Sequence, residues 1–297
     1  MDEKTLQKYI DAGKIASEAL HYGKSLIVKG AKVIEILDAV EEKIVELGGK
    51  PAFPAQISLN EFAAHSCSDL NDETVLSDQI IKLDVGVHLD GFIADNALTV
   101  DLSGEHSDLV KASRDALNNA LKIIKPGVTL GEIGGIIHDT ITNYGFAPVK
   151  NLSGHGLGEY QIHVPPSVPN FDNGNENVLK EGDVIAIEPF ASTGAGIVQE
   201  SSPATVFTLT NDSGVRDPIS RKVLIELKKN NGLPFAKRWL EKEFGSAKTN
   251  FALRMLKRAN CVEEHPPLFD QNRGMVSQAE HTVIVFEKPV VTTWYEE

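Results

Sequence analysis

Hydrophobic residues recur at helical spacing in four long segments of the chain and form strand-like runs in several shorter ones. Apolar positions three and four residues apart indicate amphipathic helices, which we expect near 3–22, 32–47, 107–124 and 130–144. Apolar runs rich in β-branched residues indicate strands, which we expect near 79–88, 92–101, 183–190, 204–210 and 276–286. The predicted order is two helices, a strand hairpin, two more helices and further strands.

The same pattern occurs twice along the chain. Residues 28–51 and 125–148 align at an offset of 97, matching Gly30 with Gly127, Glu35 with Glu132, Ile36 with Ile133, Ile44 with Ile141, Gly48 with Gly145 and Pro51 with Pro148. In each copy a glycine turn leads into a helix that a second glycine closes. Such units can look alike by chance. The favoured interpretation is a pseudo-twofold fold in which a strand from each half meets at the centre.

The hairpin at 79–101 carries two aspartates on one face. A two-residue turn at Asp90-Gly91 would place Asp84 opposite Ala97 and Asp95 opposite Gly86. Strand side chains alternate, so both carboxylates would lie on the same polar face as diagonal neighbours, about 7–8 Å apart at Cα. Like charges at this range repel unless a cation lies between them. For one aspartate alone, a solvated face is the favoured interpretation.

The segment between about 212 and 262 changes to a helical and basic pattern, as in RKVLIELKKN and FALRMLKRAN. It interrupts two strand-rich regions, and no low-complexity linker flanks it. We therefore expect one catalytic domain over 1–297 with an inserted helical subdomain. Its basic face could bind a partner or RNA, but a solvated helical surface is the favoured interpretation.

Composition narrows the class of protein. The chain has 297 residues, 29 Lys and Arg against 42 Asp and Glu, and a formal charge of −13. This charge disfavours nucleic acid or an anionic membrane as the main partner. Two cysteines are too few for a disulfide framework, and neither a signal peptide nor a transmembrane run is visible. We expect a soluble cytoplasmic protein.

Further acids and histidines occur in the strand-rich regions. His155 is flanked by glycines, His163 follows eight residues later, Glu188 ends an apolar run, and Glu280 lies inside another. Each is a weak signal alone, but burying unpaired charge is costly. Four carboxylates and one imidazole would suit two divalent cations such as Mn²⁺, Fe²⁺, Co²⁺ or Zn²⁺. Paired ions of this kind activate water and polarise a carbonyl, which indicates hydrolysis.

At this point the sequence resembles the type II methionine aminopeptidases of the short archaeal kind, across essentially its whole length. The motifs that carry the resemblance are KPAFPAQISLNEFAAH (50–65), KLDVGVHLDGFIAD (82–95), NLSGHGLGEYQIH (151–163), AIEPFASTGAG (186–196) and SQAEHT (277–282). The resemblance implies the α+β pita-bread fold, with pseudo-twofold α-β halves around a central antiparallel sheet. It also implies a dinuclear metal site, with two divalent ions per chain.

The resemblance assigns roles to individual residues. The implied metal ligands are Asp84, Asp95, His155, Glu188 and Glu280, with Asp95 and Glu280 bridging both ions. The implied catalytic residues are Glu188 as proton shuttle to a metal-bridging water, His163 at the scissile carbonyl and His65 at the scissile amide. The implied substrate-binding residues are Phe53, His65, Ile162, His163, Phe190 and His265. At His265 eukaryotic relatives carry tyrosine, so we expect a different pocket polarity.

The function implied by the resemblance is removal of the N-terminal methionine from nascent chains with a small second residue. The expected partner is that nascent N-terminus; a transient ribosome contact is an open expectation, and no membrane or specific nucleic acid is expected. We expect a monomer. One alternative is another pita-bread hydrolase of the Xaa-Pro type. It is disfavoured because such enzymes usually carry a separate N-terminal domain, whereas only 83 residues precede Asp84 here. Another is a non-enzymatic pita-bread binding protein, disfavoured because all five ligand positions are filled.

Overall fold

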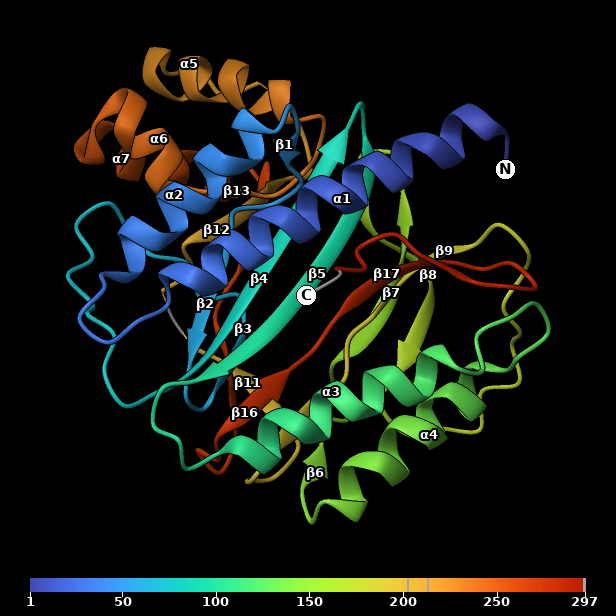
Figure 1. Ribbon diagram of the computed structural model, residues 1–297. Helices are drawn as coiled ribbons and strands as arrows, with labels where there is room; N and C mark the ends of the chain where they lie inside the picture. Colours follow the sequence, from blue (N-terminus) through green and yellow to red (C-terminus); the bar gives the residue numbers. More distant parts are fainter. Residues whose placement is uncertain (202, 213, 296–297) are drawn as a thin grey trace.

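Two long helices lie across the hairpin in the N-terminal half of the computed structural model, which describes residues 1–201, 203–212 and 214–295 (Figure 1). The elements of this half are α1 (Glu3–Leu26), α2 (Val33–Glu46), β1 (Lys50–Pro51), β2 (Gln56–Leu59), β4 (Ile80–Leu89) and β5 (Phe92–Asp101). β4 pairs with β5 on one side and with β1 and β2 on the other. The apolar face of the hairpin packs beneath α1 and α2 through Ile81, Leu83, Val85, Val87, Ala94 and Leu98.

The second half repeats this arrangement with two helices over a five-stranded sheet. Its elements are α3 (Ser107–Leu121), α4 (Leu130–Asn143), β7 (Ser153–Gly158), β8 (Gln161–Pro169), β9 (Val184–Ile187), β17 (His281–Ile284) and β18 (Val290–Val291), in the sheet order β18-β17-β9-β7-β8. α4 begins with a reciprocal capping box between Thr129 and Glu132, which satisfies amides that the first helical turn leaves free. Its buried isoleucines pack against Ile185 and Ile187.

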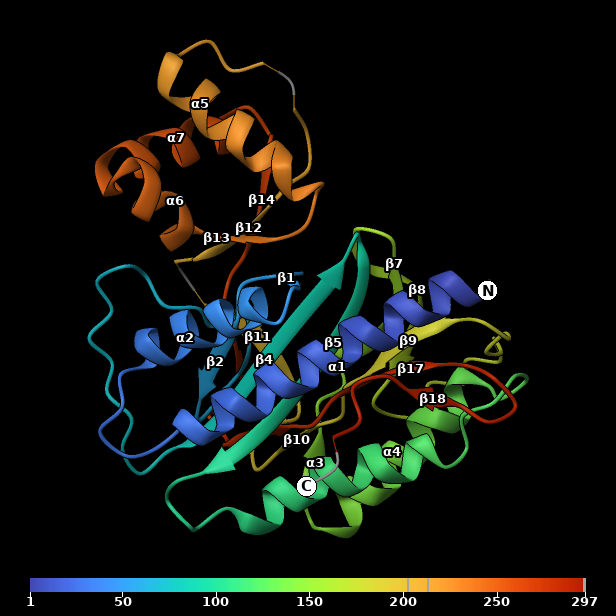
Figure 2. The ribbon, with the colours of Figure 1, turned by 45° about the horizontal axis from the view of Figure 1, so that its top comes forward.

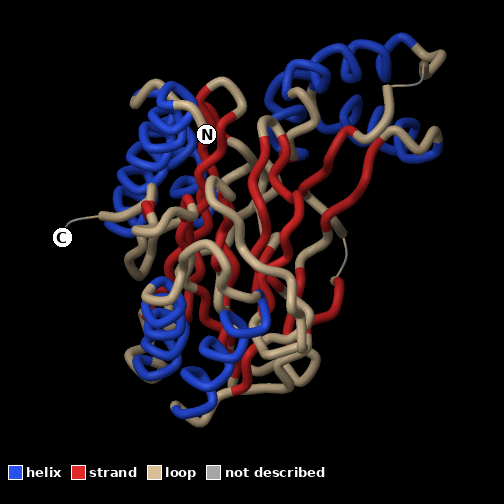
Figure 3. Tube along the Cα trace, turned by 90° about the vertical axis from the view of Figure 1, so that its right-hand side faces the viewer, coloured by secondary structure: helices blue, strands red, loops and turns tan. Residues whose placement is uncertain are grey.

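The predicted repeat is confirmed. α2 and α4 begin and end at positions 97 residues apart, and so do the short strands β1 and β6 (Ala147–Pro148). An isolated bridge from Lys32 to Val75 has a counterpart from Thr129 to Val178. Figure 3 shows the helices of both halves on one side of the strands, so the opposite faces of the strands remain available for a site.

Two small three-stranded sheets lie beside the larger ones, and two of the predicted strands prove to be divided between sheets. One contains β6, β10 (Phe190–Ser192) and β16 (Val276–Gln278). The other contains β3 (Phe62–Ala64), β11 (Val198–Glu200) and β15 (Leu268–Asp270). The predicted strand at 183–190 is broken between β9 and β10, and the one at 276–286 is broken between β16 and β17. Glu188 and Glu280 lie at these two breaks, where the backbone leaves the regular ladder.

The region predicted to be helical projects from the two halves as a separate lobe (Figure 2). It contains β12 (Val206–Leu209), α5 (Pro218–Leu227), the 3₁₀ turn η1 (Lys228–Asn230), β13 (Phe235–Ala236), α6 (Lys237–Phe244), α7 (Ser246–Arg258) and β14 (Val262–His265). β13, β12 and β14 form one sheet, and the helices pack around a separate apolar cluster. We call residues 205–265 the helical block. Its assignment as an insert at 212–262 within a single domain 1–297 stays a prediction, and residue 213 lies outside the described residues.

No helix in the described part of the chain is long and apolar enough to cross a membrane.

Candidate metal centre

The hairpin turn sets the register of the two aspartates. Asp90 and Gly91 both have positive φ, 50° and 93°, as a type I′ turn requires. The Gly91 amide also donates to Nδ1 of His88 at 3.1 Å. The resulting register pairs Asp84 with Ala97 and Gly86 with Asp95, as predicted. Both carboxylates therefore lie on the face opposite α1 and α2.

A second segment is fastened to this face by paired hydrogen bonds. The Glu280 amide donates to the Ala97 carbonyl at 3.0 Å. The Thr282 hydroxyl accepts from the Asp95 amide at 2.7 Å and donates to the Asp95 carbonyl at 2.8 Å. Thr99 makes the same reciprocal pair of bonds with the backbone of Gln278, at 2.8 and 2.6 Å. These bonds fix Glu280 beside the two aspartates.

The second half supplies His155 and Glu188. His155 pairs with Ala186 between β7 and β9, two residues before Glu188. Nε2 of His155 lies 3.8 Å from Asp95 Oδ2 and 3.8 Å from Glu188 Oε1. Candidate ligand atoms of Asp95, His155 and Glu280 all lie within 4.8 Å of one another. The structure thus brings the five predicted ligands to one place where the two halves meet.

The tautomer of His155 leaves its Nε2 atom available to bind a metal ion. Its Nδ1 lies 3.3 Å from the carbonyl oxygen of Gly156, and a carbonyl can only accept, so Nδ1 carries the proton. Burial lowers the pKa of His155 to about 3, so the ring is neutral at pH 7. Nε2 then offers a lone pair toward the carboxylates, which is the usual arrangement of a metal-binding histidine.

The four carboxylates lie in a buried cluster that opposes their ionisation. Burial raises the pKa of Asp84 to about 7. Burial, with repulsion from neighbouring carboxylates, raises the pKa values of Asp95, Glu188 and Glu280 well above normal. In the described chain no lysine or arginine forms an ion pair with any of them. Even the nearby Lys82 donates instead to the Asn60 carbonyl, at 2.7 Å.

Divalent cations fit this set of donors. Oδ1 of Asp84 and Oδ1 of Asp95 are buried and have no hydrogen-bond partner, a cost that proteins normally avoid. The side-chain amide of Gln278 approaches two of these acids, with Nε2 3.5 Å from Asp84 Oδ2 and 3.4 Å from Glu280 Oε2. Oxygen-rich ligation with one neutral imidazole suits borderline or hard divalent ions.

Metal-free protein is expected to lose stability as the pH rises from about 6.5 through the raised pKa of Asp84, at about 7. Because the folded-state pKa values of these acids are raised, their contribution is fully present below the unfolded pKa, near 4, and is lost as pH rises through the folded values. The buried histidines have lowered pKa values and oppose this trend only below about 6.5. Thermal unfolding of metal-free protein should give a falling Tm over this window, and of metal-loaded protein a flatter one. A flat profile without metal would contradict the raised carboxyl pKa values.

A cavity of about 720 Å³ opens onto the five candidate ligands. It is also lined by all six residues predicted to bind substrate: Phe53, His65, Ile162, His163, Phe190 and His265. The ring of Phe53 lies directly over Gly86, where an added Cβ would approach it to 2.1 Å. Glycine at position 86 therefore lets an aromatic wall stand beside the two aspartates.

Besides His155, three histidines line the cavity, and burial lowers the pKa of each of them. Burial, with the charges of His265 and His163, lowers the pKa of His65 to about 4. Burial, with His265, also lowers the pKa of His163. The His163 ring is 4.3 Å from that of His155, so it lies next to the candidate ligands. His265 binds the Thr208 hydroxyl through Nε2 at 2.7 Å.

Several residues that hold the site did not emerge from the sequence. Thr99, Thr282 and Gln278 orient the ligand segments, and Thr208 orients His265. Gln278 and Thr282 lie within the SQAEHT motif, so their place beside Glu280 was a usable signal. Thr99 and Thr208 are ordinary strand residues in their local sequence, and only the pairing of distant strands reveals them.

Together, the duplicated fold and an acid-rich centre at its midline define a metallopeptidase. The chain belongs to metallopeptidase family M24, whose profile matches residues 7–225. It is 48% identical to the methionine aminopeptidase of Thermococcus onnurineus over 96% of this chain and 97% of that protein. The methionine aminopeptidase of Methanocaldococcus jannaschii is 43% identical and is covered to 99%, as is this chain. The resemblance predicted from the motifs is thereby confirmed.

Solved structures agree with the fold. The methionine aminopeptidase of Thermotoga maritima aligns with a TM-score of 0.73, at 23% identity over 99% of this chain and 98% of that chain. A thermophilic Arx1 aligns with a TM-score of 0.87, at 19% identity over 100% of this chain and 92% of that chain. At these identities the likeness concerns the fold alone, and the predicted pita-bread architecture is confirmed.

Proposed function

We propose that this chain removes the N-terminal methionine from proteins and peptides whose second residue is small. The observation that carries the proposal is the convergence of Asp84, Asp95, His155, Glu188 and Glu280 on one apolar-walled cavity. The full-length similarity to archaeal methionine aminopeptidases supports the same reaction. Two divalent ions, of Mn, Fe, Co or Zn, would be held by these five side chains.

The ions, when bound, supply acidity to water and polarise the scissile carbonyl. The other roles fall to side chains of this protein. Glu188 would take up the proton that water releases and pass it to the leaving amine. The neutral His163 would donate a hydrogen bond to the carbonyl oxygen, where negative charge develops. His65, which also lines the cavity, would contact the scissile amide.

The apolar walls would hold the methionine side chain. Phe53, Ile162 and Phe190 line one cavity with the candidate ligands, and an apolar slot with few polar groups suits an unbranched thioether. His265 adds a polar edge, fixed by its bond to Thr208. Burial lowers the pKa of His265, so this edge is uncharged at neutral pH.

Gly86→Ala is expected to lower kcat/KM for methionine release by about 10- to 100-fold, mostly through KM. The added methyl group must displace the Phe53 ring, which narrows the methionine slot. Steady-state kinetics on a Met-Ala peptide measure the effect. Gly135→Ala is the matched control, because its Cβ would meet only Asp172 Cβ at an ordinary 3.6 Å. An unchanged KM in Gly86→Ala would contradict the proposal that Phe53 lines the methionine slot.

The substrate range separates this proposal from its alternatives. Metal-loaded protein should release methionine from Met-Gly and Met-Ala peptides and spare Met-Lys and Xaa-Pro peptides. Cleavage of Xaa-Pro bonds instead would favour a prolidase-type hydrolase. Absence of any cleavage would favour a binding protein on this fold. The proposed setting is the cytoplasm, where a monomer would act on nascent chains through transient contact with the ribosome, without a membrane or a specific nucleic acid.

A further inference from the structure

The loop from His65 to Asp69 joins the substrate cavity to the helical block. His65 has a φ of 63°, in the left-handed region that costs energy for any residue with a Cβ. Such a conformation persists only where its surroundings hold it. On one side the loop is held by β2, through the His65 amide to Gln56 Oε1 at 2.8 Å and the Ile57 amide to the Ser66 carbonyl at 3.1 Å.

On its other side the loop is held by the helical block. The Thr205 hydroxyl donates to the Cys67 carbonyl at 2.7 Å. Nη1 of Arg238 donates to Cys67 Sγ at 2.6 Å, and Lys237 Nζ lies 3.3 Å from both carboxylate oxygens of Asp69. Val206, Ala236 and Trp239 pack around the Cys67 side chain. The hydrogen bonds from Thr205 and Arg238 therefore both hold Cys67, which lies two positions after His65.

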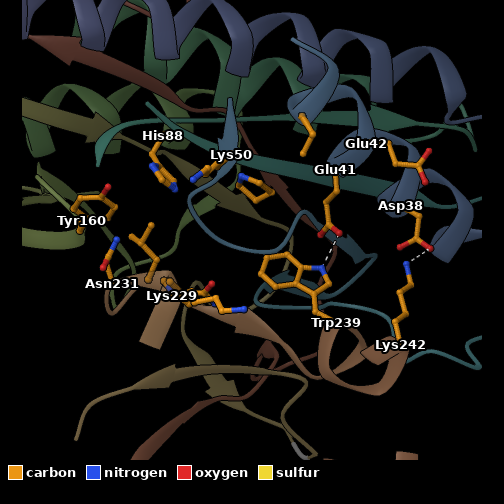
Figure 4. A pocket seen from close by; sticks show the side chains of 15 residues that line it. Asp38, Glu41, Glu42, Lys50, His88, Tyr160, Lys229, Asn231, Trp239 and Lys242 are labelled. Carbon is orange, nitrogen blue, oxygen red and sulfur yellow. Dashed lines mark hydrogen bonds and ion pairs between the residues drawn. The ribbon is translucent and has the colours of Figure 1, made fainter. Parts of the chain in front are cut away.

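Arg238 is itself firmly fixed. It is completely buried, and its other nitrogens donate to Asp38, at 3.3 Å, and to Glu41 of α2. Trp239 Nε1 donates to the second oxygen of Glu41 at 2.8 Å, and Lys242 donates to Asp38 at 2.6 Å; Figure 4 shows these two bonds at the seam between α2 and α6. A fully buried cation with satisfied carboxylate partners is costly to disturb. It gives the loop a rigid support.

We propose that Thr205 and Arg238 are positioning residues that hold His65 in its place in the substrate cavity. The helical block then influences the reaction through the Cys67 backbone and side chain. This inference rests on the proposed role of His65 at the scissile amide. Displacing a reacting or orienting group by about 1 Å can cost roughly 100-fold in rate, so a partial loss of support should appear in kcat.

The test compares Thr205→Val, which removes the hydroxyl donor, with Thr205→Ser, which keeps it. On a Met-Ala peptide, Thr205→Val should lower kcat about tenfold with KM changed less than about twofold, and Thr205→Ser should restore near-normal turnover. In a His65→Ala background the same Thr205→Val change should cause no further loss. That non-additivity is expected only if the two residues act through one another.

Two more variants distinguish positioning from general stability. Arg238→Lys keeps the charge but cannot reach Asp38, Glu41 and Cys67 together, and it should lower kcat as Thr205→Val does. Lys257→Ala breaks an exposed ion pair with Glu264 elsewhere in the helical block, and it should leave kcat unchanged.

The inference fails if Thr205→Val and Arg238→Lys both keep wild-type kcat. It also fails if Thr205→Val lowers kcat by the same factor in the His65→Ala background. If the metal-loaded wild-type protein releases no methionine, the proposed function itself is refuted. Failure of the proposed function and failure of this inference are therefore distinguishable.

Discussion

Glu280→Gln is expected to lower kcat/KM for methionine release by about 1,000-fold or more, well beyond the roughly 10- to 100-fold cost of losing an outer-shell partner of a metal ligand. Glutamine fills the same space but removes one of the four negative charges that would hold the ions. The metal-free variant should also be slightly more stable than metal-free wild-type protein, because repulsion with Asp95, Glu188 and Asp84 is relieved.

Two measurements on Glu280→Gln check this expectation. Kinetics at saturating metal report the loss of activity, and metal content after dialysis reports the loss of binding. Glu46→Gln is the matched control: its side chain is 70% exposed and forms an ion pair with Lys43 on the surface of α2, so activity should change less than about twofold. Near-normal turnover and full metal content in Glu280→Gln would contradict its place among the ligands.

His163→Ala is expected to lower kcat by about 100- to 1,000-fold, the usual cost of removing a hydrogen-bond donor to a developing oxyanion. KM should change little, because the bond strengthens mainly in the transition state. Burial lowers the pKa of His163, so its neutral, singly protonated ring persists below pH 6.5. The donor should therefore remain available at mildly acidic pH.

The control for His163→Ala is His138→Ala. His138 is a partly exposed histidine of α4 beside Asp139, outside the cavity. Steady-state kinetics at pH 7.5 should give wild-type values for His138→Ala. An equal loss in both variants, or a pure KM effect in His163→Ala, would show that His163 does not stabilise the transition state.

The parts of the site that local sequence determines were predictable. The Asp90-Gly91 turn fixes a hairpin register, and alternation then places Asp84 and Asp95 on one face; the structure has this register. The internal repeat likewise predicted a helix in each half at an offset of 97, which α2 and α4 confirm. These features follow from turn chemistry and hydrophobic periodicity, both of which are written in neighbouring residues.

The strand breaks at the glutamates were missed, although one had a local signal. Pro189 has no amide hydrogen and cannot continue a ladder, so the strand ends before Glu188 and frees that side chain. The break before Glu280 has no such residue. It depends on the bridge to Ala97 in the hairpin, which sequence periodicity does not encode.

The support of the site was not predictable because it joins segments far apart in the chain. Thr282 meets Asp95 across 187 positions, and Arg238 meets Cys67 across 171. Neither residue has an unusual local context. Buried arginine in particular contradicts the expectation that charged helical residues are solvated, so the basic pattern of the helical block suggested a surface where the structure has a buried junction.

The most direct test of this account is the metal dependence of methionine release. Protein stripped with a chelator should release no methionine from a Met-Ala peptide. Activity should return as Mn²⁺ or Co²⁺ is added back, with up to two ions bound per chain, and Glu280→Gln should stay inactive throughout. Full methionine release by verified metal-free protein, or restored activity of Glu280→Gln at stoichiometric metal, would contradict the assignment of this buried carboxylate cluster as the metal centre.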